Sequence, residues 1–119
     1  AVDTDRLYVT GLSMGGFGTL RLLSHYPDKF AAGLAICGGA WPFTAEHLAP
    51  VPLWLVHGDQ DLVVRAELSL DLVRAMRAAK SRPRLTILEN VGHDSWTQTY
   101  ADKAYYDWLK KSGRRKDHP

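Results

Sequence analysis

Short apolar runs alternate along the chain with longer stretches in which apolar residues recur at helical spacing. The short runs predict strands at Arg6 to Leu12, Ala31 to Cys37, Pro52 to His57 and Arg84 to Leu88. The second run is apolar without alternation, which is typical of a parallel strand that is covered on both faces. The pattern therefore predicts a sheet with a layer of helices on each side.

Three segments have the spacing of amphipathic helices. The first follows Ser13 and has on one face Phe17, Leu20, Leu23 and Tyr26. Pro27 predicts its end, because proline disfavours helical geometry in the residue before it. The second, Ala66 to Ala79, has on one face Leu68, Leu72, Val73 and Met76, and the third, Ala101 to Lys111, has Ala104, Tyr105, Trp108 and Leu109. Gly38 to Pro50 predicts a loop with a short helical turn at Thr44 to Leu48.

Strands that alternate with helices at this spacing predict parallel crossover connections. The expected fold class is therefore α/β, with about four parallel strands and flanking helices. A length of 119 residues fits a single hydrophobic core. We expect one domain over residues 1–111, followed by a basic polar tail over residues 112–119.

Composition and charge exclude several function classes. Hydrophobic residues make up 45% and charged residues 24% of the chain, which is typical of a globular protein. A net charge of +2 does not predict a nucleic-acid partner. The basic residues at the end of the chain are interpreted as a solvated tail: Lys110, Lys111, Arg114, Arg115 and Lys116. No apolar run is long enough to span a bilayer, so no membrane partner is expected. Cys37 is the sole cysteine, which excludes an internal disulfide and leaves the compartment open.

The segment Gly11-Leu12-Ser13-Met14-Gly15 fits the G-x-S-x-G pattern and lies between a predicted strand and a predicted helix. A tight turn there would raise the Ser13 hydroxyl above the sheet. The N–H group of Met14, at the start of the helix, would bind a developing oxyanion. The pattern therefore indicates a serine nucleophile, against the alternative of a glycine-rich turn with an incidental serine.

A serine hydroxyl needs a base and an orienting carboxylate. Two loops supply them: His57-Gly58-Asp59-Gln60-Asp61 after the third strand, and Val91-Gly92-His93-Asp94 after the fourth. Residues just past the carboxyl ends of parallel strands converge on one edge of the sheet, so Ser13, Asp61 and His93 are expected to meet there. Their order along the chain is the one associated with α/β-hydrolases.

These three motifs resemble the dienelactone-hydrolase, feruloyl-esterase and prolyl-oligopeptidase-like branch of the α/β-hydrolase superfamily, over Asp5 to about Leu109. The resemblance implies that Asp61, four residues after the histidine of H-G-x-x-D, is the acid. It implies that His93, after a glycine that follows the last strand, is the base. It implies a sheet of eight strands, of which this chain supplies what resemble the last four. The expected fold is thus a partial α/β-hydrolase fold without the amino-terminal half of the usual sheet.

Alternative roles stay open for several residues. Asp59 is a rival acid whose simpler role is to brace its turn, Asp94 is expected to be loop structure, and His57 is expected to be structural. A metal site built from all five histidine and aspartate residues of the two loops would leave the serine motif unexplained, so no metal or cofactor is expected. Trp41 and Trp96 are candidates for lining a substrate pocket, with core packing as the alternative.

The expected function is a serine esterase that cleaves short-chain or aryl carboxylic esters through an acyl-enzyme. Alternatives are a peptidase of the prolyl-oligopeptidase-like type and a catalytically silent assembly domain. The second oxyanion donor of the fold comes from a loop that would lie upstream of Ala1. A fragment, a naturally reduced enzyme and a half completed by association all stay open. We expect a homodimer or larger homo-oligomer, because the strand Arg6 to Leu12 would be an open edge.

Overall fold

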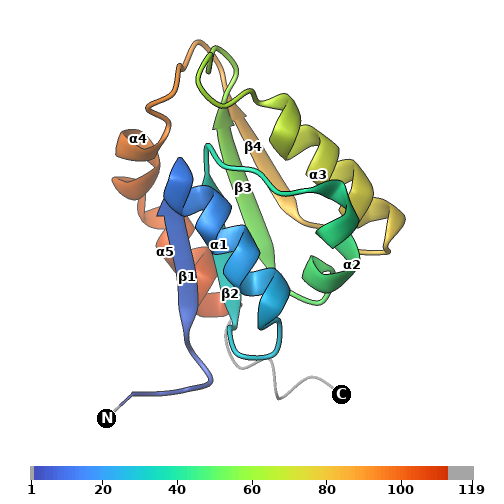
Figure 1. Cartoon of the computed structure of the whole chain (residues 1–119). Helices are drawn as coiled ribbons and strands as arrows, with labels where there is room; N and C mark the ends of the chain where they lie inside the picture. The colour runs from blue at the N-terminus through green and yellow to red at the C-terminus, as the bar shows by residue number, and fades with distance from the viewer. Residues whose placement is uncertain (1, 113–119) are drawn as a thin grey trace.

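The computed structural model describes residues 2–112 and contains one sheet of four parallel strands in the order β1-β2-β3-β4 (Figure 1). The strands are β1 (Tyr8–Leu12), β2 (Ala32–Ile36), β3 (Leu53–Gly58) and β4 (Arg84–Leu88). The helices are α1 (Met14–His25), α2 (Ala45–Leu48), α3 (Glu67–Ala78), α4 (Trp96–Tyr100) and α5 (Lys103–Lys111), with a 3₁₀ turn at Pro42–Thr44. This confirms the expected α/β class, with predicted strand ends within two residues of those observed.

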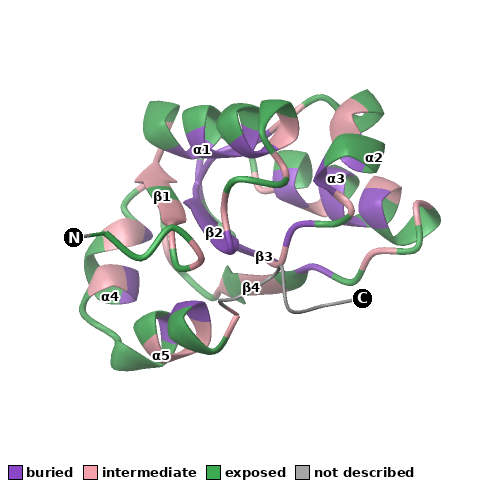
Figure 2. Ribbon diagram, turned by 90° about the horizontal axis from the view of Figure 1, so that it is seen from below, coloured by how far each residue is buried: buried purple, intermediate pink, exposed green. Residues whose placement is uncertain are grey.

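Each strand pairs with its neighbour in chain order, from Tyr8 beside Ala32 at one side to Gly58 beside Leu88 at the other. All residues of β2 and β3 are buried, whereas β1 and β4 are only partly buried (Figure 2). The two inner strands have unbroken apolar runs because helices cover both of their faces.

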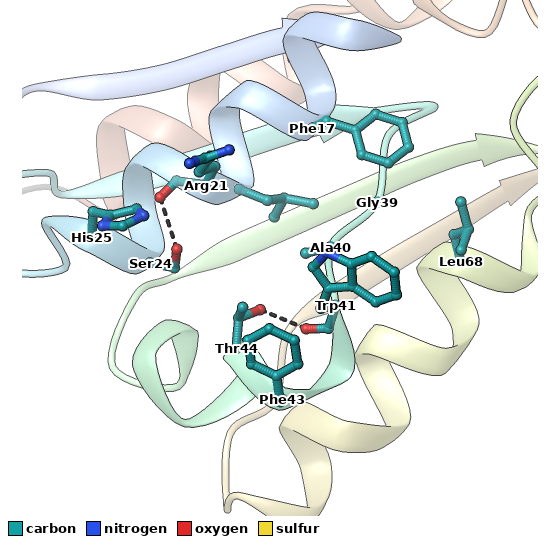
Figure 3. A pocket seen from close by; sticks show the side chains of 11 residues that line it. Phe17, Arg21, Ser24, His25, Gly39, Ala40, Trp41, Phe43, Thr44 and Leu68 are labelled. Atoms are coloured by element: carbon teal, nitrogen blue, oxygen red, sulfur yellow. Dashed lines mark hydrogen bonds between the residues drawn. The ribbon is translucent and has the colours of Figure 1, made fainter.

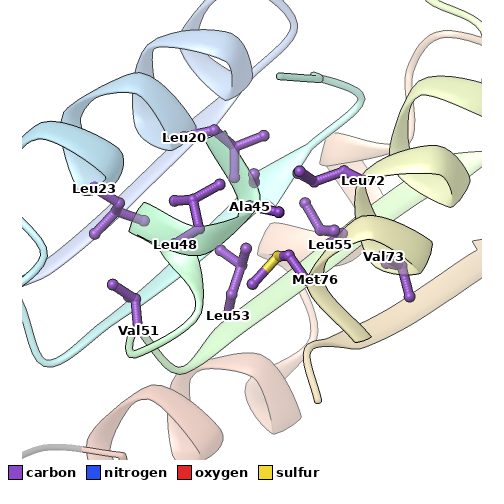
Figure 4. Packing of buried hydrophobic residues seen from close by; sticks show 11 residues of the cluster. Leu20, Leu23, Ala45, Leu48, Val51, Leu53, Leu55, Leu72, Val73 and Met76 are labelled. Atoms are coloured by element: carbon purple, nitrogen blue, oxygen red, sulfur yellow. The ribbon is translucent and has the colours of Figure 1, made fainter. Parts of the chain in front are cut away.

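Two apolar clusters lie on opposite faces of the sheet, because side chains alternate along each strand. On one face, helices α1, α2 and α3 contribute Leu20, Leu48 and Met76, which pack on Leu53 and Leu55 of β3 (Figure 4). On the other face, Tyr105 and Leu109 of α5 pack with Leu34, Ile36, Trp54 and Val56. The chain thus closes its core on both sides of β2 and β3.

Four residues expected on buried helical faces are exposed instead: Phe17, Tyr26, Leu68 and Ala104. Phe17 and Leu68 line a surface groove described below. The last helix begins at Lys103, two residues later than expected, because the Asp102 side chain caps it by accepting the Ala104 N–H at 2.9 Å. Helix α4 was not predicted, since five residues give too short a pattern. The predicted tail lies, apart from Ser112, outside the described residues.

Strand β1 has a single neighbour, β2, within the described residues. Its unpaired side is the edge through which we predict self-association, because exposed backbone N–H and C=O groups pair readily with another strand. One chain has a mass of 13.3 kDa. Light scattering on a size-exclusion peak should give at least twice that mass. A folded monomer would contradict this prediction.

No helix among the described residues has the length and apolarity needed to cross a membrane.

Candidate active site

Ser13 occupies a sharp turn between β1 and α1, with backbone angles φ 53° and ψ −119°. A positive φ is unfavourable for a residue with a side chain and costs on the order of 1–3 kcal/mol unless its surroundings impose it. Here the Ser13 N–H donates to the carbonyl of Ile36 at 2.9 Å and to the sulfur of Cys37 at 3.2 Å. The end of β2 therefore fixes the turn that presents the Ser13 hydroxyl.

The two glycines of the motif have different surroundings. A Cβ atom on Gly11 would lie 2.2 Å from the carbonyl oxygen of Gly15, whereas a Cβ on Gly15 would have no neighbour within 4 Å among the described residues. The first glycine thus permits the close approach of strand and helix at the turn, and the second is not required for that packing.

We predict that Gly11→Ala lowers the free energy of unfolding by at least about 2 kcal/mol, because the added methyl group overlaps backbone atoms that cannot move aside easily. Gly15→Ala is the matched control and should leave stability unchanged or raise it slightly, because alanine favours helix. Urea unfolding followed by circular dichroism measures both. Equal losses in the two variants would show that the tight contact at Gly11 does not decide the turn.

The loops after β3 and β4 lie against each other. The N–H of Asp59 donates to the carbonyl of Leu88 at 3.0 Å, and that of Gln60 donates to the carbonyl of Val91 at 2.9 Å. A Cβ atom on Gly58 would lie 2.3 Å from the Val91 oxygen, so only glycine allows this approach. These contacts bring Asp61 and His93 together across 32 residues of sequence.

The three side chains predicted from the motifs form one hydrogen-bonded chain. Ser13 Oγ lies 2.9 Å from His93 Nε2, and His93 Nδ1 lies 2.9 Å from Asp61 Oδ2. The other carboxylate oxygen of Asp61 accepts the N–H groups of Val63 and Val64, both at 2.9 Å. The Asp61 carboxylate is buried, while 23% of the His93 side chain is exposed. The arrangement can hold the proton of His93 on Nδ1 and leave Nε2 free to accept the proton of Ser13.

The Asp61 carboxyl has a shifted pKa. Burial alone raises it, but the hydrogen bond from His93, the N–H groups of Val64 and Val63 and the charge of His93 together lower the pKa below its ordinary value of 3.8. The group is therefore ionised in the folded protein over a wider pH range than in the unfolded chain.

A depressed carboxyl pKa stabilises the folded state above the unfolded-state pKa, and this contribution is lost as pH falls through the folded-state pKa. We predict that Asp61→Asn destabilises the protein at pH 7 and that the difference from the parent shrinks as pH falls below about 3.8. Urea unfolding at a series of pH values measures it. Asp71→Asn, which removes only an exposed i,i+3 pair with Arg74, should show a small effect at every pH. A constant difference for Asp61→Asn would contradict the prediction.

The structure also gives positions for the alternative residues. Asp59 accepts the N–H of Asn90 at 2.8 Å and so braces the loop before His93. Asp94 accepts the N–H and the hydroxyl of Thr97, at 2.9 and 2.8 Å, and so caps α4. Neither carboxylate bonds the His93 ring.

His57 is fully buried, and both of its ring nitrogens have partners. Nε2 lies 2.6 Å from the carbonyl oxygen of Val64, which only accepts, so this nitrogen carries a proton. Nδ1 lies 2.8 Å from Ser69 Oγ, and Nε2 is also 3.4 Å from Asp61 Oδ2. His57 therefore supports the loop that holds Asp61, as a structural histidine would. The sequence did not show that His57 is buried. Its position just before Gly58 in the H-G-x-x-D motif was the only sign that it belongs to the loop that holds Asp61.

Met14 begins α1, so its N–H has no acceptor within the helix and lies at the positive end of the helix dipole. This is the donor expected for an oxyanion on a group bonded to Ser13. The Met14 side chain is 85% exposed and takes no part in the core.

A groove of about 710 Å³ is lined by α1, the loop at residues 39–41, the 3₁₀ turn and the start of α3 (Figure 3). Phe17, one helical turn after Ser13, lines it together with Gly39, Trp41, Phe43 and Leu68, and Arg21, Ser24 and His25 lie toward the end of α1. Trp41 thus lies in the groove, stacked on Phe43 with ring centroids 6.3 Å apart. Trp96 lies elsewhere, packed edge-on against the His93 ring at 5.4 Å and against the second apolar cluster. The contribution of Phe43 to the groove was missed, because a loop has no periodic pattern.

Known proteins resemble the chain in sequence. The model of the phospholipase/carboxylesterase family matches residues 1–109. A bifunctional acetylxylan esterase/xylanase of Neocallimastix patriciarum is 42% identical over 64 residues, which are 53% of this chain and 9% of that protein. A poly(3-hydroxyalkanoate) depolymerase C of Paucimonas lemoignei is 46% identical over 41 residues, which are 34% of this chain and 10% of that protein. The chain spans about a tenth of the length of these curated relatives.

Solved structures share the fold over nearly the whole chain. A thermostable esterase superposes with a TM-score of 0.90 at 35% identity, over 95% of this chain and 32% of that one. An acylaminoacyl peptidase of Pyrococcus horikoshii superposes with a TM-score of 0.84 at 17% identity, over 95% of this chain and 25% of that one, which shows a common fold alone. From the family match and these superpositions, the chain belongs to the phospholipase/carboxylesterase family of the α/β-hydrolase superfamily.

Proposed function

We propose that the chain carries the active site of a serine carboxylesterase, with Ser13 as nucleophile, His93 as general base and Asp61 as the acid that orients His93. The observation that carries the proposal is the hydrogen-bonded chain from Ser13 Oγ through His93 to the buried Asp61 carboxylate. Family membership and the esterases among the relatives support ester hydrolysis as the reaction.

The geometry suggests a two-step reaction. Ser13 Oγ attacks the ester carbonyl carbon while its proton moves to Nε2 of His93, and the Met14 N–H stabilises the oxyanion. Collapse of the intermediate breaks the bond to the alcohol oxygen, which takes the proton from His93 and leaves an acyl-serine. Water then attacks the acyl carbon and gives its proton to His93. The bond from that carbon to Ser13 Oγ breaks, Oγ takes the proton back from His93, and the carboxylic acid leaves. Asp61 stays ionised throughout and stabilises the imidazolium.

Two measurements test the proposal. With p-nitrophenyl acetate the protein should release a burst of nitrophenol equal to its active sites, because we expect acylation by this activated ester to be faster than hydrolysis of the acyl-enzyme. A fluorophosphonate should label the protein once, and peptide mass spectrometry should place the label on Ser13. A label on another residue would overturn the assignment of the nucleophile. Cleavage of a matched peptide amide at a rate comparable to that of the ester would favour a peptidase.

We assign the acyl or aryl part of the substrate to the groove. It begins at Phe17, one turn from Ser13, and its exposed aromatic walls suit an apolar ligand. Trp41 and Phe43, which are 72% and 78% exposed, have ring surface free to contact such a group. Trp96 packs against His93 and does not line the groove. A contact between Trp96 and substrate therefore stays a prediction.

A further inference from the structure

Cys37 takes no part in the proposed reaction, yet it lies beside the residues that do. It follows β2, is fully buried, and its sulfur accepts the Ser13 N–H at 3.2 Å. The sulfur, one ring nitrogen of His93 and one carboxylate oxygen of Asp61 all lie within 4.8 Å of one another. Thiolate, imidazole and carboxylate are the three side-chain ligands that zinc takes in proteins.

We propose that Cys37, Asp61 and His93 form an inhibitory binding site for a thiophilic divalent metal ion of the zinc class. Bonds of about 2.3 Å to sulfur and about 2.0 Å to nitrogen or oxygen separate tetrahedral ligands by about 3.5 Å, and by slightly less where neither ligand is sulfur. The present separations of up to 4.8 Å therefore need to shrink by at most about 1.5 Å. A change of side-chain rotamer at His93, the partly exposed member, supplies such a movement for its own two separations, and the distance between Cys37 and Asp61 changes by rotation about their side-chain bonds.

The charges of the site balance a divalent ion. On binding, the S–H bond of Cys37 breaks, its proton leaves to solvent, and the sulfur bonds the metal. A thiolate and a carboxylate then offset the two positive charges, and the imidazole of His93 adds a neutral lone pair. A buried ion is tolerated only when it is compensated in this way.

A second buried group points into the same place. The hydroxyl of Ser95 is fully buried and hydrogen-bonds the thiol of Cys37. Because a thiol is a weak hydrogen-bond partner, the Ser95 hydroxyl is placed to bond a metal ion held by the sulfur, or a water that the ion carries.

Binding of the ion and catalysis exclude each other. A metal on the His93 ring occupies a lone pair or displaces the bond to Asp61, and either change removes the base that Ser13 requires. The inhibition rests on the function proposed above, whereas the binding does not. The two are therefore tested separately.

The binding test uses Cd²⁺ and the Ser13→Ala variant, which keeps all three ligands and cannot form an acyl-enzyme. Cd²⁺ should produce the ultraviolet charge-transfer absorption of a thiolate–cadmium bond with a stoichiometry of one. Because Cys37 is the sole cysteine, this absorption can come from no other residue. Adding His93→Ala should weaken Cd²⁺ binding at least tenfold. No absorption at saturating Cd²⁺, or equal affinity without His93, would overturn the three-residue site.

The inhibition test measures p-nitrophenyl acetate hydrolysis with Zn²⁺, after subtraction of the metal-only rate. Zn²⁺ should inhibit the parent protein, and EDTA should restore the rate. The Cys37→Ala and Cys37→Ser variants, each compared with its own uninhibited rate, should need at least about tenfold more Zn²⁺. Equal sensitivity in parent and variants would place the inhibitory ion elsewhere and overturn the proposal, even if Cd²⁺ binds.

Discussion

Ser13→Ala is expected to lower kcat for p-nitrophenyl acetate by about 10⁴-fold or more, since in serine hydrolases loss of the nucleophile costs up to about 10⁶. The variant keeps His93, Asp61 and the Met14 N–H, but it has no oxygen to receive the acyl group. What remains is slow attack by water, aided by the oxyanion donor and by binding. The nitrophenol burst and the fluorophosphonate label should both disappear.

Ser112→Ala is the matched control for this experiment. Ser112 follows α5 and does not line the groove, and its hydroxyl only donates to the carbonyl of Trp108 at 2.9 Å. Its kcat should stay within about threefold of the parent, as expected for a substitution outside the reacting groups. Circular dichroism checks that both variants are folded. Turnover that survives in folded Ser13→Ala would show that another residue is the nucleophile.

Asp61→Asn should lower kcat by about 10⁴-fold, the loss seen when the acid of a serine triad becomes an amide. The amide can turn its NH₂ toward Nδ1 of His93, which then accepts a hydrogen bond. The ring proton moves to Nε2 in that tautomer, so Nε2 can no longer take the proton of Ser13. KM should change far less than kcat, because Asp61 is buried and bonds no substrate group.

Asp59→Asn separates this effect from a general disturbance of the loop. Asp59 lies two residues from Asp61, and the amide oxygen of asparagine can still accept the Asn90 N–H that Asp59 accepts now. Its kcat should stay within about threefold of the parent. A larger loss in Asp59→Asn than in Asp61→Asn would make Asp59 the acid and would require a different loop conformation.

The strands could be predicted because burial leaves a direct mark on sequence. Strands β2 and β3 are covered on both faces, so nearly every position is apolar and the segments stand out. Helix faces were harder to predict. Phe17 and Leu68 have core-like spacing, yet they border a groove, because spacing identifies a shared face and not what covers that face. Helix α4 has only five residues, and the Asp94 side chain before it accepts the Thr97 N–H, a local hydrogen bond that leaves no periodic pattern in the sequence.

The three candidate site residues could be predicted because each lies in the segment that follows a parallel strand, and the carboxyl ends of such strands meet at one side of the sheet. The support of these residues could not be predicted. The bond from Ser13 to the Cys37 sulfur, and the bonds of His57 to Ser69 and to Val64, depend on side-chain directions. No periodic pattern specifies such directions, so a thiol and a histidine in apolar surroundings read as simple core residues.

Ser13, Asp61 and His93 lie beyond the carboxyl ends of the strands, and none of the candidate site residues lies at the opposite side, where the strands begin. There the chain turns between helix and strand, at residues 26–31, 49–52 and 79–83. Lys80, with φ 68°, makes the last of these turns without help from a site residue. Length changes at that side need not move the strand ends that carry the three side chains. We therefore expect a domain insertion at Lys80 to be tolerated better than the same insertion near Gln60, which would separate Asp61 from His93.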